Sequence, residues 1–124
     1  MSHFLIVVLL SGFASQYSRS TFERVIANRQ KWGQLVDAPK TDGYVAVEDC
    51  RRVGEVLYLR PVGGEWERFL IADCAGGEAT RQWMRRNRIV VEVDTETAKR
   101  WGFPEMRGIP VEAGKRIVEK WRAE

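Results

Sequence analysis

Two short segments end in the same dipeptide, Asp-Cys, and together they contain both cysteines of the chain. Val47-Glu48-Asp49-Cys50 and Ile71-Ala72-Asp73-Cys74 are each a short apolar run that ends in this pair. Two strands that end alike would bring both cysteines and several carboxylates to one end of a small β domain. The pattern therefore predicts a disulfide with an acidic site beside it. Two buried free thiols, as found in cytosolic proteins, are the alternative.

Composition describes one ordinary globular domain. The chain has 124 residues, of which 44% are hydrophobic and 30% charged, and its net charge is +3, so it can form a core without help from a cofactor. Fifteen of the twenty basic residues are arginine, which suits bidentate contacts to carboxylates, phosphates or sugar-acid polymers. A solvated basic surface is the commoner explanation. His3 is the only histidine, and the acidic residues lack the spacing of a metal site, so no metal and no cofactor are expected.

An apolar run near the N-terminus, Phe4 to Leu10, is open to two interpretations. It is followed by small residues, which is typical of a short secretory signal with cleavage after Ala14. A first β-strand is the competing interpretation, and the signal segment is the one that we favour. The run is too short to cross a bilayer as a helix, so no transmembrane span is predicted.

Short strands are predicted along most of the chain. Runs of β-favouring residues bounded by Gly, Pro or charge lie at Tyr44–Val47, Glu55–Arg60, Glu67–Ala72 and Ile89–Val93. Two more strands are expected near Ala14–Ser18 and at Ile109–Glu112, the latter with a continuation to Val118. Six strands are the right number for a small closed barrel.

Three helices are expected between these strands. The first begins with a capping box at Ser20-Thr21-Phe22-Glu23 and ends at Gly33. The second covers Glu78–Arg86. The third is capped by Asp94 and ends at Gly102.

Three stretches, in this order, carry a resemblance to a known family. Gly12–Ser18 resembles an opening Gly-x-Ala-Ser-aromatic-Tyr-Gly strand, Val53–Asp73 resembles a segment that leads to an Asn-Asp-Arg-Gly turn, and Val91–Gly102 resembles an Ile-Asp-Leu-Ser segment with its following helix. The family is that of the rare lipoprotein A-like double-psi β-barrels, which is related to expansins and barwin.

The resemblance implies a mainly β fold, a six-stranded double-psi β-barrel with short helical insertions. The barrel would occupy residues 12–113, with a signal segment or first strand at 1–14 and a C-terminal extension at 114–124. The implied location is secreted or in the cell envelope, and the implied partner is peptidoglycan. Some relatives cut peptidoglycan as lytic transglycosylases, whereas expansins loosen walls without hydrolysis. We expect a monomer.

The resemblance also implies three acidic site residues. The turn Asp of the family falls on Asp73, the Asp of Ile-Asp-Leu-Ser on Glu92, and a His before the second strand on Glu48. Glycan cleavage needs a carboxylic acid, usually one with a raised pKa, and like-charged neighbours would raise that of Asp73. Asp73 is therefore the expected acid, supported by Glu92 and Glu48; a role as a turn residue is the structural alternative.

Other features leave further functions open. Trp66 and Tyr17 could offer aromatic faces to sugar rings. The replacement of the family's His by Glu48 favours a non-catalytic glycan-binding or interaction module on the same barrel. The segment Arg81–Arg88 alternates arginine with an aromatic residue, as single-strand nucleic-acid binders do, but arginines on a helix usually form a solvated face. A nucleic acid is therefore not the expected partner.

Overall fold

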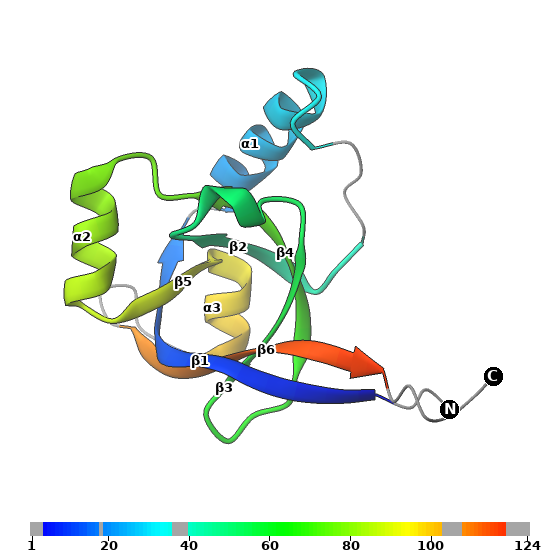
Figure 1. Ribbon diagram of the computed structural model, residues 1–124, viewed down its shortest axis with the longest axis vertical. Helices are drawn as coiled ribbons and strands as arrows, with labels where there is room; N and C mark the ends of the chain where they lie inside the picture. The colour runs from blue at the N-terminus through cyan, green and yellow to red at the C-terminus, as the bar shows by residue number, and fades with distance from the viewer. Residues whose placement is uncertain (1–3, 18, 36–39, 103–107, 119–124) are drawn as a thin grey trace.

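The structure, a computed structural model, describes residues 4–17, 19–35, 40–102 and 108–118 (Figure 1). The mainly β fold expected from the sequence is confirmed. Six strands are present: β1 (Phe4–Tyr17), β2 (Gly43–Val47), β3 (Val56–Pro61), β4 (Glu67–Cys74), β5 (Ile89–Asp94) and β6 (Ile109–Val118). The helices of the described residues are α1 (Arg19–Lys31), α2 (Glu78–Arg86), α3 (Thr95–Trp101) and the single 3-10 turn η1 (Cys50–Arg52). None of the described helices is both long and apolar enough to cross a membrane.

The six strands form a closed ring of hydrogen bonds. Their order is β1-β5-β2-β4-β3-β6, and β6 pairs with β1 to close the ring. The pairs β1–β5 and β2–β4 are parallel, and the other four pairs are antiparallel. Each strand therefore has two neighbours, and the sheet has no free edge along its central part.

The connectivity of the ring repeats after three strands. If β1, β2 and β3 exchange places with β4, β5 and β6, the order of neighbours is unchanged. The exchange also converts one parallel pair into the other, and each of these pairs contains one register shift. The connections follow the same rule, because α1 and α2 come after β1 and β4, and η1 and α3 come after β2 and β5. The two halves thus share one topology, although their sequences show no repeat.

The N-terminal apolar run lies in β1, as the strand interpretation proposed. The strand expected near Ala14 begins much earlier, at Phe4, and Ala14 pairs with Val91 of β5 and Ile109 of β6. β1 is thus the strand that closes the ring. β6 continues to Val118 and pairs with β1 along its length, so the residues expected to begin a C-terminal extension belong to the sheet. His3 and residues 119–124 lie outside the described residues.

Two groups of buried side chains hold the fold together. The larger group fills the inside of the ring with residues from all six strands, among them Val45, Leu59, Phe69, Val91 and Val111. The smaller group lies outside the ring beneath α1, where Phe22 and Ile26 pack on Ala46, Leu70 and Ala72. The second group fixes α1 over the β2–β4 face. Complete burial of side chains of this size contributes about 1.5–3 kcal/mol each.

Local capping interactions and turn residues determine where the helices begin and end. α2 has the predicted bounds, and α1 begins at Arg19, before the predicted capping box. Asp94 caps α3 as expected, because its carboxylate accepts a hydrogen bond from Thr97 N, and Gly102 ends the helix with a left-handed backbone (φ 74°). Asp94 is fully buried and also accepts from Tyr44 N at 2.9 Å. Its role is therefore structural.

Candidate functional site

The predicted disulfide is present and joins Cys50 to Cys74. β2 and β4 run parallel with Val47 opposite Cys74, so both strands end at the same edge of the sheet. Cys50 follows β2 by three residues, and the two Cα atoms lie 4.9 Å apart, within the range that a disulfide requires. The free-thiol alternative is therefore wrong.

Glu92 and Asp73 lie in one row that crosses four neighbouring strands. Ser15 of β1 is opposite Glu92 of β5, Glu92 is opposite Ala46 of β2, and Ala46 is opposite Asp73 of β4. The only side chain between the two acids in this row is the methyl group of Ala46. The fold therefore brings together two of the three predicted acids, which we call the acid pair.

The surroundings of Glu92 oppose its charge. Burial raises the pKa of the Glu92 carboxyl, and the negative charge of Asp73 raises it further. A hydrogen bond from Ser15 Oγ to Glu92 Oε2 at 3.4 Å acts in the opposite direction and lowers this pKa. A carboxyl group that holds its proton more firmly than usual is suited to general-acid chemistry.

Asp73 has a different partner, which the sequence did not reveal. Its Oδ1 accepts a hydrogen bond from Arg29 Nη2 of α1 at 2.9 Å, and the side chains are 24% and 21% exposed. Arg29 Nη1 also donates to Gln34, and Arg29 Nε is buried without a hydrogen-bond partner in the described part of the chain. The Asp73 carboxylate is therefore a half-buried ion-pair member. An arginine on the same helical face as Phe22 and Ile26 was the one signal that could have pointed to it.

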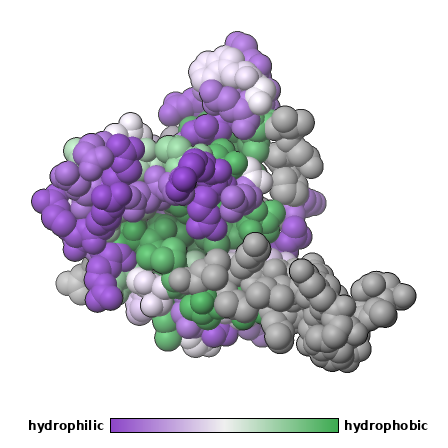
Figure 2. Space-filling view, viewed as in Figure 1, coloured by the Kyte–Doolittle hydropathy of each residue, from purple (hydrophilic) through white to green (hydrophobic). Residues whose placement is uncertain are grey.

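A groove of about 670 Å³ lies beside the disulfide, between α2 and η1. Its walls carry five arginines: Arg51, Arg52, Arg81, Arg85 and Arg88. Apolar side chains, including Val47, Met84 and Val90, line the rest. Figure 2 shows this arrangement as an apolar surface between the hydrophilic α2 and the hydrophilic η1 turn. We call it the arginine groove.

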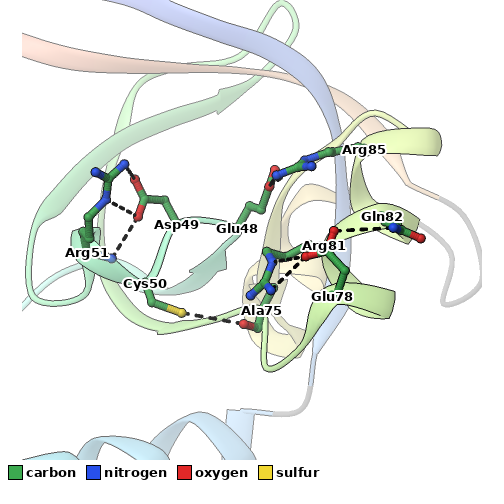
Figure 3. Close-up of polar contacts among 9 residues, drawn as sticks. All are labelled: Glu48, Asp49, Cys50, Arg51, Ala75, Glu78, Arg81, Gln82 and Arg85. Atoms are coloured by element: carbon green, nitrogen blue, oxygen red, sulfur yellow. Dashed lines mark hydrogen bonds and ion pairs between the residues drawn. The ribbon is translucent and has the colours of Figure 1, made fainter.

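Glu48 lies in the arginine groove, where its carboxylate pairs with Arg85. Arg85 Nε donates to Glu48 Oε1 at 2.7 Å, so the pair joins α2 to the end of β2 (Figure 3). Asp49 pairs with Arg51 through two side-chain hydrogen bonds of 3.0 and 2.9 Å. These bonds, chiefly, lower the pKa of Asp49 to about 2. Both acids are therefore paired with arginines of the groove wall.

Figure 3 also draws a contact from Cys50 Sγ to the carbonyl oxygen of Ala75, at 3.6 Å. A disulfide sulfur carries no proton, so this contact is not a conventional hydrogen bond. The contact nevertheless shows that the disulfide lies against the backbone that leads from β4 to α2. The disulfide thus forms part of the groove wall.

The acid pair is linked to the arginine groove through β5 and through the disulfide, although neither acid lines the groove. Val90 lines the groove, and Glu92 is two residues further along β5. On the other side, Cys50 lines the groove and its disulfide partner Cys74 directly follows Asp73. The groove and the acid pair are therefore neighbours along β5 and across the disulfide.

The two predicted aromatic residues lie in different places. Tyr17 is at the end of β1, two residues beyond Ser15; it is 40% exposed and packs edge-on against Phe22 at a ring distance of 5.5 Å. Trp66 directly precedes β4 in the loop between β3 and β4, and Figure 1 shows this loop at the bottom of the view, below α2 and η1. The Arg60 guanidinium carbon lies 4.3 Å from the centre of the Trp66 ring. Tyr17 is therefore close to the acid-pair row, whereas Trp66 is remote from it.

No family model, no curated protein and no solved structure matches this chain. Within the described residues, no group of three or more His, Cys, Asp and Glu side chains could hold a metal ion. The chemistry of the site therefore has to be argued from its own residues.

Proposed function

We propose that this protein is a rare lipoprotein A-like double-psi β-barrel of the cell envelope or the secreted fraction, which binds peptidoglycan and cleaves its glycan strands. The observation that carries the proposal is the acid pair. Glu92 has a raised pKa and lies in one row with a second carboxylate, Asp73, with Ala46 between them. Most enzymes that cleave glycosidic bonds use two carboxyl groups whose environments differ, so that one can act as the acid.

The topology supports the assignment to the double-psi class. A double-psi barrel consists of two interlocked halves, and here the closed ring maps onto itself when the first three strands exchange with the last three. The parallel pairs β1–β5 and β2–β4 occupy equivalent places in the two halves. The resemblance of residues 12–113 to this family predicted six strands in such an arrangement.

In this proposal Glu92 rather than Asp73 is the acid, and the raised pKa of Glu92 supports this choice. Glu92 would give its proton to the glycosidic oxygen as the bond to the anomeric carbon breaks. In a lytic transglycosylase the same residue then takes a proton from a hydroxyl of the sugar, and that oxygen forms the new bond to the anomeric carbon. Asp73, which pairs with Arg29, would stabilise the positive charge that develops on the sugar ring.

The disulfide supports a location outside the cytoplasm. Disulfides persist in oxidising compartments and are rare where glutathione and thioredoxin keep thiols reduced. Both cysteines of this chain are bonded. A cell-envelope or secreted location also matches the proposed substrate, because the peptidoglycan wall lies outside the inner membrane.

Incubation with purified peptidoglycan, followed by mass spectrometry of the released fragments, tests the proposal. We expect sugars that end in an anhydro ring, and their formation should fall about 10²–10⁴-fold in Glu92→Gln, since that is the usual cost of losing a general acid. Asp73→Asn should also slow the reaction. Glu65→Gln, a change of an exposed acid in the β3–β4 loop, is the matched control and should leave it unchanged. Cleavage that survives Glu92→Gln at full rate would remove this residue from the mechanism.

A non-catalytic wall-binding module is the second candidate. The pairing of Glu48 with Arg85 favours it, because the family has a histidine at this place and here a carboxylate is neutralised instead. Under this alternative the protein would bind peptidoglycan, and no anhydro product would form with the unaltered chain. Binding without cleavage in the same incubation would therefore favour the module.

A further inference from the structure

The arginine groove contains one arginine in an unusual backbone conformation. Arg88 follows α2 and has a left-handed backbone with φ 56°, the only non-glycine residue with positive φ in the described chain. Side chains with a Cβ are disfavoured in this region, and glycine is the residue usually found where a helix ends in it. Two backbone hydrogen bonds hold Arg88 in place, from its N–H to Arg85 O and from Phe13 N–H to its own carbonyl at 2.8 Å.

Arg88 also differs from the other arginines of the groove in its charge balance. The other four each pair with a carboxylate: Arg51 with Asp49, Arg52 with Glu55, Arg81 with Glu78 and Arg85 with Glu48. Among the described residues Arg88 has no such partner. Each paired guanidinium still has N–H groups to spare, because it carries five and its partner accepts one or two. The groove therefore has one uncompensated cation and several further donors around it.

The remaining lining of the groove restricts what could bind. The described lining residues include no aromatic side chain, so the groove lacks the stacking faces on which single-stranded nucleic acids depend. Small aliphatic surfaces from Val47, Met84 and Val90 lie between the arginines. Planar guanidinium groups match carboxylates in shape and charge. The lining thus fits a chain that carries carboxylates and small apolar groups.

We propose that the arginine groove binds the carboxylate groups of the wall polymer, with Arg88 as the principal cation. The inference deepens the proposed function, on which it rests for the identity of the polymer, by naming the charged part that is recognised. Such carboxylates could belong to the short peptides attached to the glycan or to the sugars themselves. Bound in this way, the polymer would lie beside the disulfide, whose Cys74 directly follows Asp73.

Binding of five probes to three variants tests this inference. The probes are peptidoglycan with its peptides, the same material after an amidase has removed them, polygalacturonate as a sugar acid, a neutral chitin oligosaccharide, and a single-stranded polynucleotide. Arg88→Gln removes the charge from the groove. Arg86→Gln makes the same change two residues earlier, at the end of α2 and outside the groove lining, and is the matched control.

We expect the acidic probes to bind more tightly than chitin, and raised salt to weaken that binding. Arg88→Gln should weaken it about tenfold, as expected for the loss of one charge-assisted contact, and Arg86→Gln should change it less than twofold. Preference for intact over amidase-treated peptidoglycan would place the carboxylates on the peptides. Equal binding of these two, together with binding of polygalacturonate, would place them on the sugars.

A third variant, Arg88→Gly, separates binding from folding. Glycine relieves the left-handed backbone, so the melting temperature should stay the same or rise while binding falls as in Arg88→Gln. Three results would each overturn the inference. These are an equal loss of affinity for the acidic probes in Arg88→Gln and Arg86→Gln, an affinity for chitin equal to that for the acidic probes, and tighter binding of a single-stranded polynucleotide than of the acidic probes. Loss of cleavage in Glu92→Gln is a separate readout, so the proposed function and this inference can fail independently.

Discussion

Glu92 is the residue whose surroundings bear most directly on function. The fold places this carboxyl in a row with Ser15 and Asp73, and burial and the nearby negative charge favour its neutral form. Sequence reasoning identified both acids of the pair and predicted Asp73 as the acid, but it could not foresee the burial that raises the pKa of Glu92. It also missed Arg29, whose contact with Asp73 spans 44 positions of the chain. A partner so distant in sequence cannot be read from local pattern.

The raised pKa of Glu92 makes a prediction about stability and pH. Since its folded-state pKa lies above the ordinary 4.5, the stability contributed by Glu92 is fully present below about pH 4.5 and is lost as the pH rises through the raised value. At neutral pH the charged side chain therefore opposes folding. We expect Glu92→Gln to be more stable than the unaltered protein at pH 7, with the gain disappearing below pH 4.5.

Urea unfolding between pH 3.5 and pH 8 measures this effect. Glu65→Gln, an exposed change of the same kind, should shift the free energy of unfolding little at any pH. A gain in Glu92→Gln that stays constant across the range would mean that it arises from packing rather than from the charge.

At the scale of elements, the end of β5 shows how one side chain joins three segments. The fully buried Asp94 carboxylate caps α3 through Thr97 and also accepts the backbone N–H of Tyr44 in β2. The sequence predicted the cap, because an Asp directly before a helical segment is a local signal. The bond to Tyr44 could not be predicted, since it depends on β2 and β5 being neighbours.

Removal of the Asp94 carboxylate should be costly. Asp94→Ala leaves the buried N–H groups of Thr97 and Tyr44 without their acceptor, and we expect the free energy of unfolding to fall by about 3 kcal/mol. Asp94→Asn keeps one oxygen and should lose less. Urea unfolding of both variants measures the difference, and equal losses would mean that the cap oxygen is not what matters.

The disulfide ties the ends of β2 and β4 together, and it too makes a prediction. The cysteines are 24 positions apart, and closing a loop of this size stabilises a fold by roughly 3–4 kcal/mol in the chain-entropy model. Thermal unfolding with and without reductant should therefore differ by on the order of ten degrees. Intact-mass measurement after alkylation checks the starting state; two thiols labelled without reductant would contradict the bond.

For the whole molecule, local signals determined most elements but not their arrangement. The bounds of α2 and the starts of most strands followed from turn residues and β-favouring runs. The apolar run at Phe4–Leu10 remained open to two interpretations, a signal segment and a first strand, because its place in the sheet depends on pairing with the distant β6. The exchange symmetry of the ring was also hidden, since the two halves share connectivity without sharing residues. The arginine groove combines η1, α2 and β5, which no single stretch of sequence contains.

The closure of the ring also determines when folding can finish. β1 is synthesised before the other five strands, yet its neighbours are β5 and β6, the last two of the six along the chain, and the paired residues Ser15 and Glu92 are 77 positions apart. A newly made chain must therefore carry an apolar, unpaired β1 until β5 and β6 have been made. Contacts of such long range slow folding, and an exposed strand of this kind promotes aggregation. The ring can therefore close only after β6 has been made. Until then, contacts between incomplete chains would promote aggregation.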